Sequence, residues 1–195
     1  KGPTIVTYFP NIDLDAARQG RYRSRYWGAL HELLEKGNVA VNWVFIYAES
    51  PQLTYLESVE LRERLAKSDS SARFFLVEEF LDVKSFLWVF GRWIVLTGRS
   101  LWARHRLKRR FRFPGSRLDL WAALREDWNS SFSGEVAVDN LFWDEAFQRM
   151  SRLLPKGPWG LYLWENQGWE KALVSAWRTR GPSFILGCQH STLRP

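Results

Sequence analysis

The chain has 195 residues, of which 46% are hydrophobic, so it can build one large domain with a core of its own. Its single cysteine excludes an intramolecular disulfide, and one cysteine with three scattered histidines makes no zinc-binding pattern. With 28 Lys and Arg against 21 Asp and Glu, the net charge is +7, which favours an anionic partner such as a nucleotide, phospholipid, anionic glycan or nucleic acid.

The first part of the chain alternates predicted strands with predicted helices. β-branched and aromatic residues predict strands over 4–9, 39–48 and 72–80. Asp13 is a suitable N-cap for a helix running over 14–37, and Ser50 followed by Pro51 predicts the start of a second helix. The order strand, helix, strand, helix, strand is typical of a parallel sheet with helices on its faces.

The alternation stops after the third strand and resumes near the end. Residues 82–153 contain no convincing strand and at least three helical stretches. A strand over 159–165, a helix over 167–181 and a strand over 183–188 follow, with Cys188 expected to be buried. We therefore predict an α/β fold in a single domain, 1–195. Its Rossmann-like parallel sheet would have about five strands, with a helical insertion over 82–153 between strands three and four.

A basic, aromatic stretch lies inside the predicted insertion. Residues 92–112 hold eight Lys or Arg and no acid. Three interpretations stay open: a solvated basic helix face, a surface that lies on anionic lipid, and single-stranded nucleic-acid binding. No recognised nucleic-acid module accompanies the stretch, and two arginines argue against a spanning helix. The candidate membrane-surface residues are Arg92, Trp93, Arg99, Trp102, Arg106, Lys108, Arg109 and Arg110.

The carboxyl ends of the predicted strands define a candidate binding site, because ligands of open α/β sheets bind there. Strands four and five end in "WENQGWE" and "QHST", which we expect to lie close together. The candidate residues at this edge are Asn11, Glu165, Asn166, Gln167, Glu170, Gln189, His190, Ser191 and Thr192.

The charged candidates each have two possible roles. Glu165 is either a general base or sugar-hydroxyl acceptor, or a cap of the following helix. Glu170 lies in the first helical turn, which favours capping. His190 either shuttles a proton or contacts a phosphate, or it bonds to nearby backbone. The chain has no phosphate-binding glycine loop and no nucleophile elbow, and we predict neither a metal nor a cofactor.

Several segments together resemble a known protein family. "YFPNID", "GRYRSRYWGALHELL", "NWVFIY", "LYLWENQGWEKALVSAWR" and "ILGCQHST" resemble bacterial surface-carbohydrate biosynthesis proteins that look like two-domain GT-B glycosyltransferases. The resemblance is strongest over residues 159–192. It implies that this chain is the N-terminal, acceptor-side domain, one half of a GT-B architecture. The C-terminal domain is expected to be absent from the chain, and the isolated chain is expected to be inactive.

The resemblance also implies roles for the candidate site. Glu165 and His190 would be catalytic, and the other residues at that edge would contact the substrates. The substrates would be a nucleotide sugar, with no further cofactor, and a glycan or lipid-linked acceptor. The expected location is cytoplasmic, with the basic helix on the inner face of the bacterial inner membrane. The alternative is a non-catalytic α/β module that binds a membrane or a protein partner.

Overall fold

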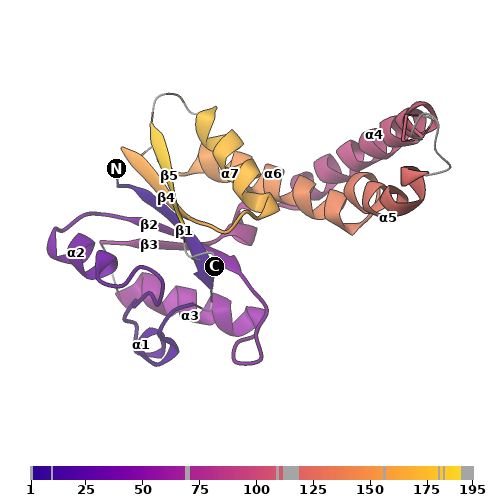
Figure 1. The fold of residues 1–195 in the computed structure, drawn as a ribbon. Coiled ribbons are helices and arrows are strands. Elements are labelled where there is room, and N and C mark those ends of the chain that lie inside the picture. Colours follow the sequence, from indigo (N-terminus) through magenta and orange to yellow (C-terminus); the bar gives the residue numbers. More distant parts are fainter. Residues whose placement is uncertain are drawn as a thin grey trace, which may run out of the picture. The chain divides into compact units, whose positions relative to one another are not determined.

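The computed structural model describes residues 2–9, 11–68, 71–108, 110–111, 119–155, 157–179, 181 and 183–189. The chain forms two compact units, of which unit 1 comprises Lys1–Phe80 and Ala146–Pro195 and unit 2 comprises Leu81–Glu145. Figure 1 shows the ribbon of both.

Unit 1 is built on a five-stranded parallel sheet in the order β3-β2-β1-β4-β5. The predicted α/β fold with a Rossmann-like parallel sheet is therefore confirmed. The strands are β1 (Thr4–Phe9), β2 (Asn42–Tyr47), β3 (Arg73–Leu76), β4 (Trp159–Trp164) and β5 (Phe184–Gln189).

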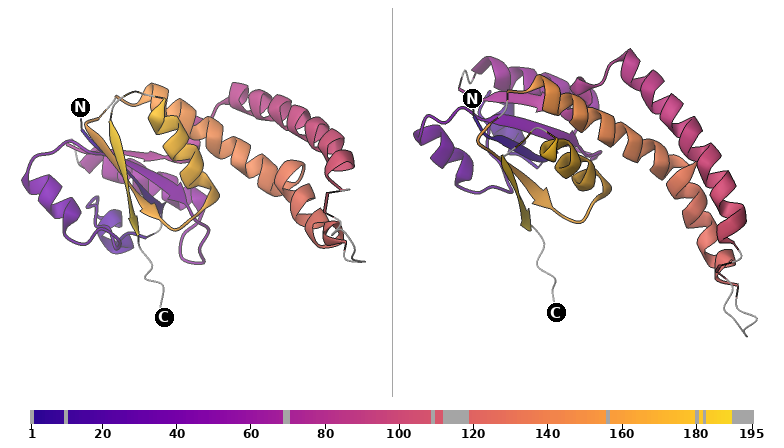
Figure 2. Two further views of the ribbon diagram at one scale, coloured as in Figure 1. Left: turned by 45° about the horizontal axis from the view of Figure 1, so that its top comes forward. Right: turned by 90° about the horizontal axis from the view of Figure 1, so that it is seen from above.

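Helices cover both faces of this sheet (Figure 2). On one face, Ile5, Phe9 and Phe45 form a buried core with Leu61 and Leu65 of α3. On the other face, α7 packs its buried side chains against β1 and β4. The helices of unit 1 are α1 (Leu14–Arg18), α2 (Leu30–Lys36), α3 (Tyr55–Ser68), α7 (Gly168–Arg178) and the end of α6 (Glu135–Leu153).

The close approach of α7 to the sheet depends on a glycine in β4. A Cβ atom added at Gly160 would lie 2.7 Å from the ring of Trp177, so only glycine leaves room for that ring. The Trp177 indole N–H then donates to the carbonyl of Ser183 at 3.1 Å, just before β5. The C-terminal end of α7 is thereby fixed against the start of β4, at the amino-terminal edge of the sheet.

The predicted helix over 14–37 is wrong, because the structure has two short helices, α1 and α2, with irregular chain between them. Asp13 caps α1 as predicted, but Gly20 and Gly28 have left-handed backbone angles, with φ of 76° and 49°. The irregular segment places the ring of Tyr22 4.5 Å from that of Trp43. Core packing of one aromatic residue therefore outweighs continuation of the helix.

Two other boundaries differ from the prediction. The α3 helix begins at Tyr55 rather than at Pro51, because Thr54 and Glu57 cap it: the Glu57 carboxylate accepts from the Thr54 N–H at 2.8 Å. Strand β3 ends at Leu76, and Val77–Phe80 forms a 3₁₀ helix, η1. The first helical turn of η1 therefore takes Glu78 out of the sheet.

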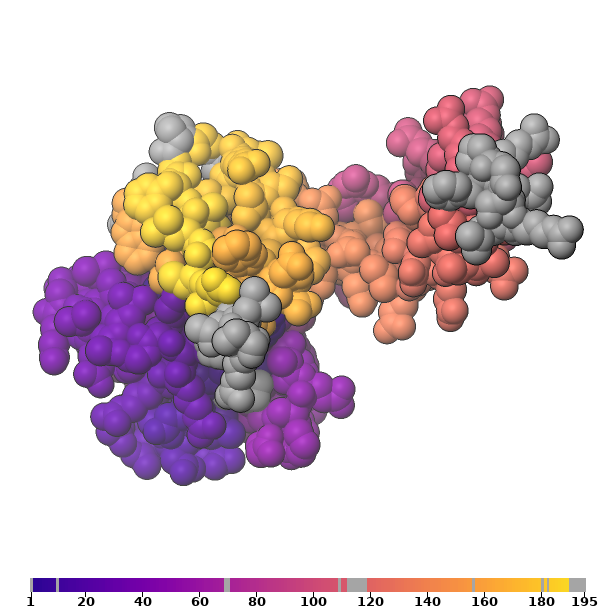
Figure 3. Space-filling view, viewed as in Figure 1, coloured from indigo at the N-terminus to yellow at the C-terminus, as the bar shows by residue number. Residues whose placement is uncertain are grey.

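Strand β5 is an edge strand, and most of its side chains are exposed (Figure 3). In the register with β4, Phe184, Leu186 and Cys188 share one face, and all three are exposed. The expectation that Cys188 is buried is therefore wrong: an apolar neighbourhood in sequence buries a residue only where another element covers that face.

Unit 2 consists of α4 (Val83–Leu107), α5 (Leu120–Phe132) and the first part of α6. Its interior is aromatic and includes the buried Trp121, whose ring lies 5.8 Å from that of Trp128. The Trp128 indole N–H donates to the hydroxyl of Ser100 on α4 at 2.8 Å. Arg92 of α4 pairs with Asp144 of α6 at 3.0 Å, so all three helices are tied together.

Candidate functional site

The strand order locates the candidate site. Strand β1 has β2 on one side and β4 on the other, so the direction of the chain connections reverses at β1 and β4. Ligands of open α/β sheets bind at this reversal, beyond the carboxyl ends of the strands. The residues that follow β1 and β4 therefore lie at the expected binding position, and they include the predicted candidates Asn11 and Glu165.

At this reversal, Tyr8 links an indole to a carboxylate. The Trp169 indole N–H donates to the Tyr8 hydroxyl at 2.9 Å, and the Tyr8 hydroxyl in turn donates to the carboxylate of Glu165. Trp169 is buried, and its ring stands nearly perpendicular to that of Tyr8. A fixed indole thus orients a hydroxyl that contacts the half-buried Glu165.

Asn11, in the loop after β1, binds a second tyrosine, Tyr26, from the segment between α1 and α2. The side-chain amide of Asn11 donates to the hydroxyl of Tyr26. The negative charge of Glu165 contributes to raising the pKa of Tyr26. Asn11 and Glu165, both candidates from the sequence, therefore lie in one cluster with Tyr8, Tyr26 and Trp169.

Burial and charge keep both tyrosines protonated. Burial raises the pKa of Tyr8 to about 12; the bond from Trp169 opposes this, and the charges of Glu165 and Glu170 add to it. Burial also raises the pKa of Tyr26, with Glu165 as a further cause. Both hydroxyls therefore remain hydrogen-bond donors throughout the physiological pH range.

The Glu170 carboxylate stabilises the turn that leads into α7. Its buried carboxylate accepts from the backbone N–H of Glu165 and from that of Gln167, both at 2.8 Å. It thus occupies the N-terminal turn of α7, where a carboxylate is favoured by the helix dipole. Of the two interpretations of Glu170, the structure gives it the capping position.

A groove of about 660 Å³ runs along α7 beside the cluster. Its walls combine exposed aromatic surface on Trp164 with the side chains of Asn166 and Gln167, and Lys171 and Arg178 lie along it. Asn166 has a left-handed backbone, with φ of 60°, where the chain turns from β4 towards α7. The turn 165–167 thus belongs to the cluster at one end and to the groove at the other.

The remaining candidates are placed only in part. Gln189 ends β5, and His190, Ser191 and Thr192 lie outside the described residues. The structure adds Tyr8, Tyr26 and Trp169, which the sequence analysis did not select. The signal for Tyr8 was its place one residue before the end of a predicted strand, at the edge of the sheet where "WENQGWE" also lies.

A second carboxylate lies at the edge of β2 and β3, apart from this cluster. Glu78 in η1 is largely enclosed, and its Oε2 atom has no hydrogen-bond partner in the described parts of the chain. Burial raises the pKa of Glu78, which backbone N–H groups of Glu78 and Tyr47 oppose. Its exposed neighbour Glu79 pairs with Arg62.

The candidate membrane-surface residues do not all point outward. Arg99, Trp102, Arg106, Lys108 and Arg110 are exposed, and Arg109 lies outside the described residues. Trp93 is half-buried and donates to the carbonyl of Ser133 at 3.0 Å, while Arg92 pairs with Asp144. Trp93 is therefore turned partly towards the interior of unit 2, whereas Arg92 is exposed and held by an acid of α6.

The described residues contain neither a cluster of metal ligands nor a membrane-spanning helix. No group of three or more His, Cys, Asp or Glu side chains there is arranged to hold a metal ion. No helix in the same ranges has both the length and the apolar character needed to span a bilayer. Among known proteins, no family model matches the chain and no curated protein matches it.

Proposed function

We propose that the chain is the N-terminal, acceptor-side half of a GT-B-type glycosyltransferase in bacterial surface-polysaccharide biosynthesis. The observation that supports it most is the Tyr8–Glu165 contact at the strand-order reversal, next to a groove with an exposed Trp164 and two amides. Aromatic faces pack against sugar rings, and carboxylates and amides bind hydroxyl groups. The sequence resemblance over residues 159–192 points to the same activity.

The helix ends beside the crevice favour a neutral hydroxylated ligand over a phosphate. Open N-termini of helices bind phosphates through their free N–H groups and their dipole. Here the Asp13 carboxylate accepts from Asp15 and Ala16 on α1, while the Glu170 carboxylate lies in the first turn of α7 and accepts from two N–H groups of the turn before it. Carboxylates therefore occupy both ends, which supports an acceptor site and leaves the nucleotide to the other domain.

In the proposed reaction Glu165 is the general base. An acceptor hydroxyl donates its hydrogen bond to the Glu165 carboxylate. As the acceptor oxygen bonds to the anomeric carbon of the donor sugar, its proton moves to Glu165 and the bond to the nucleotide phosphate breaks. Tyr8 holds the carboxylate in place for this proton transfer.

Under this proposal the protein is cytoplasmic and works at the inner face of the bacterial inner membrane. The donor is a nucleotide sugar that serves as a substrate, and the acceptor is a glycan or a lipid-linked glycan. His190, which lies outside the described residues, stays a candidate contact to donor or acceptor. The groove along α7 would accommodate acceptor sugars beyond the reacting one, since it continues from the turn 165–167.

Glu165→Gln in the full-length enzyme tests the proposal. We expect turnover of a panel of nucleotide sugars with a lipid-linked acceptor fraction to fall about 10²- to 10⁴-fold, the usual contribution of a general base. Circular dichroism would check the fold, and Glu63→Gln on the exposed side of α3 is the matched control. Turnover of the Glu165→Gln variant within a few-fold of the wild type would remove Glu165 from catalysis.

The alternative, a non-catalytic membrane- or partner-binding module, has one observation in its favour. The α4 helix exposes many large apolar side chains, among them Leu87 and Leu101. Such a module needs no base, so its binding would be unchanged by Glu165→Gln. Absence of sugar transfer from every nucleotide sugar, with intact binding through α4, would favour the module over the enzyme.

A further inference from the structure

The α4 helix has an outward face that is apolar for most of its length. Its inward face is marked by the buried Ser85, Val89 and Ser100. On the opposite side lie the side chains that helical periodicity puts together. This outer face comprises Val83, Lys84, Leu87, Phe90, Gly91, Ile94, Val95, Gly98, Leu101, Trp102 and His105, all of them exposed.

A ridge of three aliphatic residues runs along the outer face. Leu87, Ile94 and Leu101 follow one another at seven-residue intervals, about 10 Å or two turns apart. Their side chains are 69%, 51% and 60% exposed, a degree of exposure that is costly to leave in water. The charged residues between Leu87 and Leu101 lie on other faces of the helix, so the ridge is continuous.

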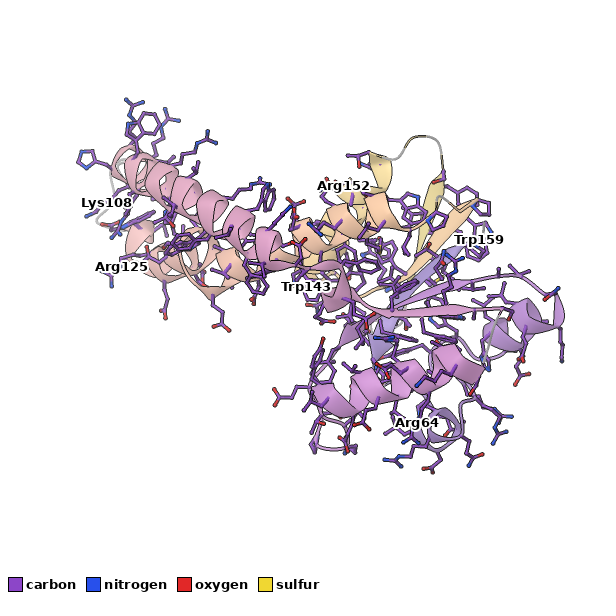
Figure 4. The ribbon with its side chains drawn as sticks, turned by 180° about the vertical axis from the view of Figure 1, so that it is seen from behind. Arg64, Lys108, Arg125, Trp143, Arg152 and Trp159 are labelled. Atoms are coloured by element: carbon purple, nitrogen blue, oxygen red, sulfur yellow. The ribbon has the colours of Figure 1, made fainter. Side chains whose placement is uncertain are left out.

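The charges of α4 are all of one sign. The helix contains no Asp or Glu, while Lys84, Arg92, Arg99, Arg104 and Arg106 are basic. Arg106 stacks on the exposed ring of Trp102 at 4.1 Å. Neither Arg99 nor Arg106 forms an ion pair within the described residues. Figure 4 shows the side chains of this helix, with Lys108 labelled at its C-terminal end.

We propose that α4 docks on an anionic phospholipid surface, with the outer face in the interface and Arg99 and Arg106 on the lipid phosphates. An apolar stripe bordered by arginine and tryptophan is the pattern of helices that lie in the membrane plane. Long arginine side chains reach the headgroups while their stems cover apolar surface. This inference gives the proposed membrane location its surface, and it does not depend on the transferase chemistry.

A second copy of the chain fits the same face less well. Two α4 helices packed face to face would bring Arg99 and Arg106 of each copy to the border of the contact, with no acid on either helix to pair with them. An anionic bilayer would both bury the apolar ridge and neutralise the positive charge, whereas a second copy would only bury the ridge. The charge of α4 therefore decides for the lipid.

The glycines of the outer face separate these two occupants experimentally. A Cβ atom added at Gly91 or Gly98 would meet nothing within 4 Å. Gly98→Leu therefore adds apolar surface without disturbing unit 2. It would strengthen insertion into lipid, but it would obstruct close packing against a second helix.

Co-sedimentation of the whole chain with vesicles tests the proposal. We expect binding to vesicles of phosphatidylcholine mixed with phosphatidylglycerol, and much weaker binding to phosphatidylcholine alone or at high salt. Arg99→Gln with Arg106→Gln should weaken that binding about 30-fold. The charge-matched control on α3, Arg64→Gln with Lys67→Gln, should change it only a few-fold; Arg64 is labelled in Figure 4.

The apolar ridge has a test of its own. Leu87→Gln with Leu101→Gln should weaken vesicle binding about tenfold, and Gly98→Leu should strengthen it about fivefold. Equal binding to neutral and anionic vesicles, or none, would overturn the proposal. So would weaker binding by Gly98→Leu together with a dimer that this change dissociates, or an oligonucleotide affinity that exceeds the lipid affinity.

These measurements are separable from the proposed function because none of them requires turnover. Loss of activity in Glu165→Gln with unchanged vesicle binding would leave the docking surface intact. Conversely, a chain that transfers sugar but does not bind anionic vesicles would contradict the docking proposal and leave the proposed function intact.

Discussion

The indole N–H of Trp169 donates to the hydroxyl of Tyr8 at 2.9 Å, although the two residues are 161 positions apart in the chain. This bond joins the first turn of α7 to the end of β1 and orients the hydroxyl that contacts Glu165. The position of the candidate base thus depends on a contact between the two chain segments that make up unit 1.

Removal of the Tyr8 hydroxyl should destabilise the protein. Tyr8→Phe leaves the N–H of the buried Trp169 without its partner, which costs about 1–3 kcal/mol. Urea unfolding of the two proteins measures the difference. Tyr162→Phe is a matched control, because its ring also contacts Trp169, at 6.0 Å, while its hydroxyl forms no hydrogen bond among the described residues. An equal loss in both variants would contradict the special role of the Tyr8 bond.

Tyr8 should also make stability depend on alkaline pH. Its pKa in the folded protein is about 12, above the usual value of 10.0, so the folded state holds this proton more tightly than the unfolded state. The contribution is therefore fully present below pH 10 and is lost as the pH rises towards 12. We expect the stability gap between wild type and Tyr8→Phe to narrow over that range, as measured by urea unfolding at several pH values. A gap that widens would reverse the assignment.

Glu170→Ala should cost stability rather than chemistry. The change removes the acceptor of two backbone N–H groups at the start of α7, which costs about 2 kcal/mol. Thermal unfolding provides the measurement, and Glu63→Ala on α3 should stay within about 0.5 kcal/mol of the wild type. A Glu170→Ala protein of normal stability would mean that the α7 turn is held by other contacts.

Glu78→Gln should stabilise the protein at neutral pH. Burial raises the pKa of Glu78 above its usual 4.5, so the carboxyl favours the folded state below that pH and the benefit is lost as the pH rises through the raised value. The substitution removes the buried charge, and we expect a gain of about 1 kcal/mol at pH 7 that disappears in acid. Chemical denaturation of the wild type and of Glu78→Gln, at pH 7 and in acid, measures this difference.

The neighbouring carboxylate provides a contrast with the opposite sign. Glu79 pairs with Arg62 and accepts from the backbone N–H of Leu76 at 3.2 Å. Glu79→Gln should therefore lower stability at neutral pH. If both substitutions lowered stability equally, burial would not be the dominant influence on Glu78.

Replacing the two exposed glycines of α4 by alanine should stabilise the protein. Because a Cβ atom meets nothing at Gly91 or Gly98, alanine improves helix propensity by about 1 kcal/mol at each position without a clash. Thermal unfolding of the single and double alanine variants tests the expectation. A loss of stability would show that another element packs against this face.

The strands were the most predictable part of the molecule. Strand β1 was predicted with its actual bounds, Thr4–Phe9, because β-branched and aromatic residues fill it and proline follows. The break within 14–37 is not predictable in the same way, because the apolar residues of its second half have true helical spacing and form α2. What breaks the predicted helix is the insertion of Tyr22 into the core, a tertiary effect that local periodicity does not reveal.

The candidate site was predictable in its location but not in its contacts. The end of β4 and the loop after β1 follow from the rule for parallel sheets, and this rule found Glu165 and Asn11. The pairing of Glu165 with Tyr8 depends on β4 lying next to β1, which the sequence alone did not establish. The capping position of Glu170 became clear only from the two backbone N–H groups that donate to its carboxylate.

The exposed thiol of Cys188 gives the protein a ready-made attachment point. Since the chain has one cysteine and it lies on an uncovered strand, a maleimide fluorophore or spin label should couple at a single position without any engineering. That label would sit on β5, one residue before the end of the strand. Titration with nucleotide sugars, acceptor glycans or vesicles would then give an optical or magnetic signal from unmodified sequence.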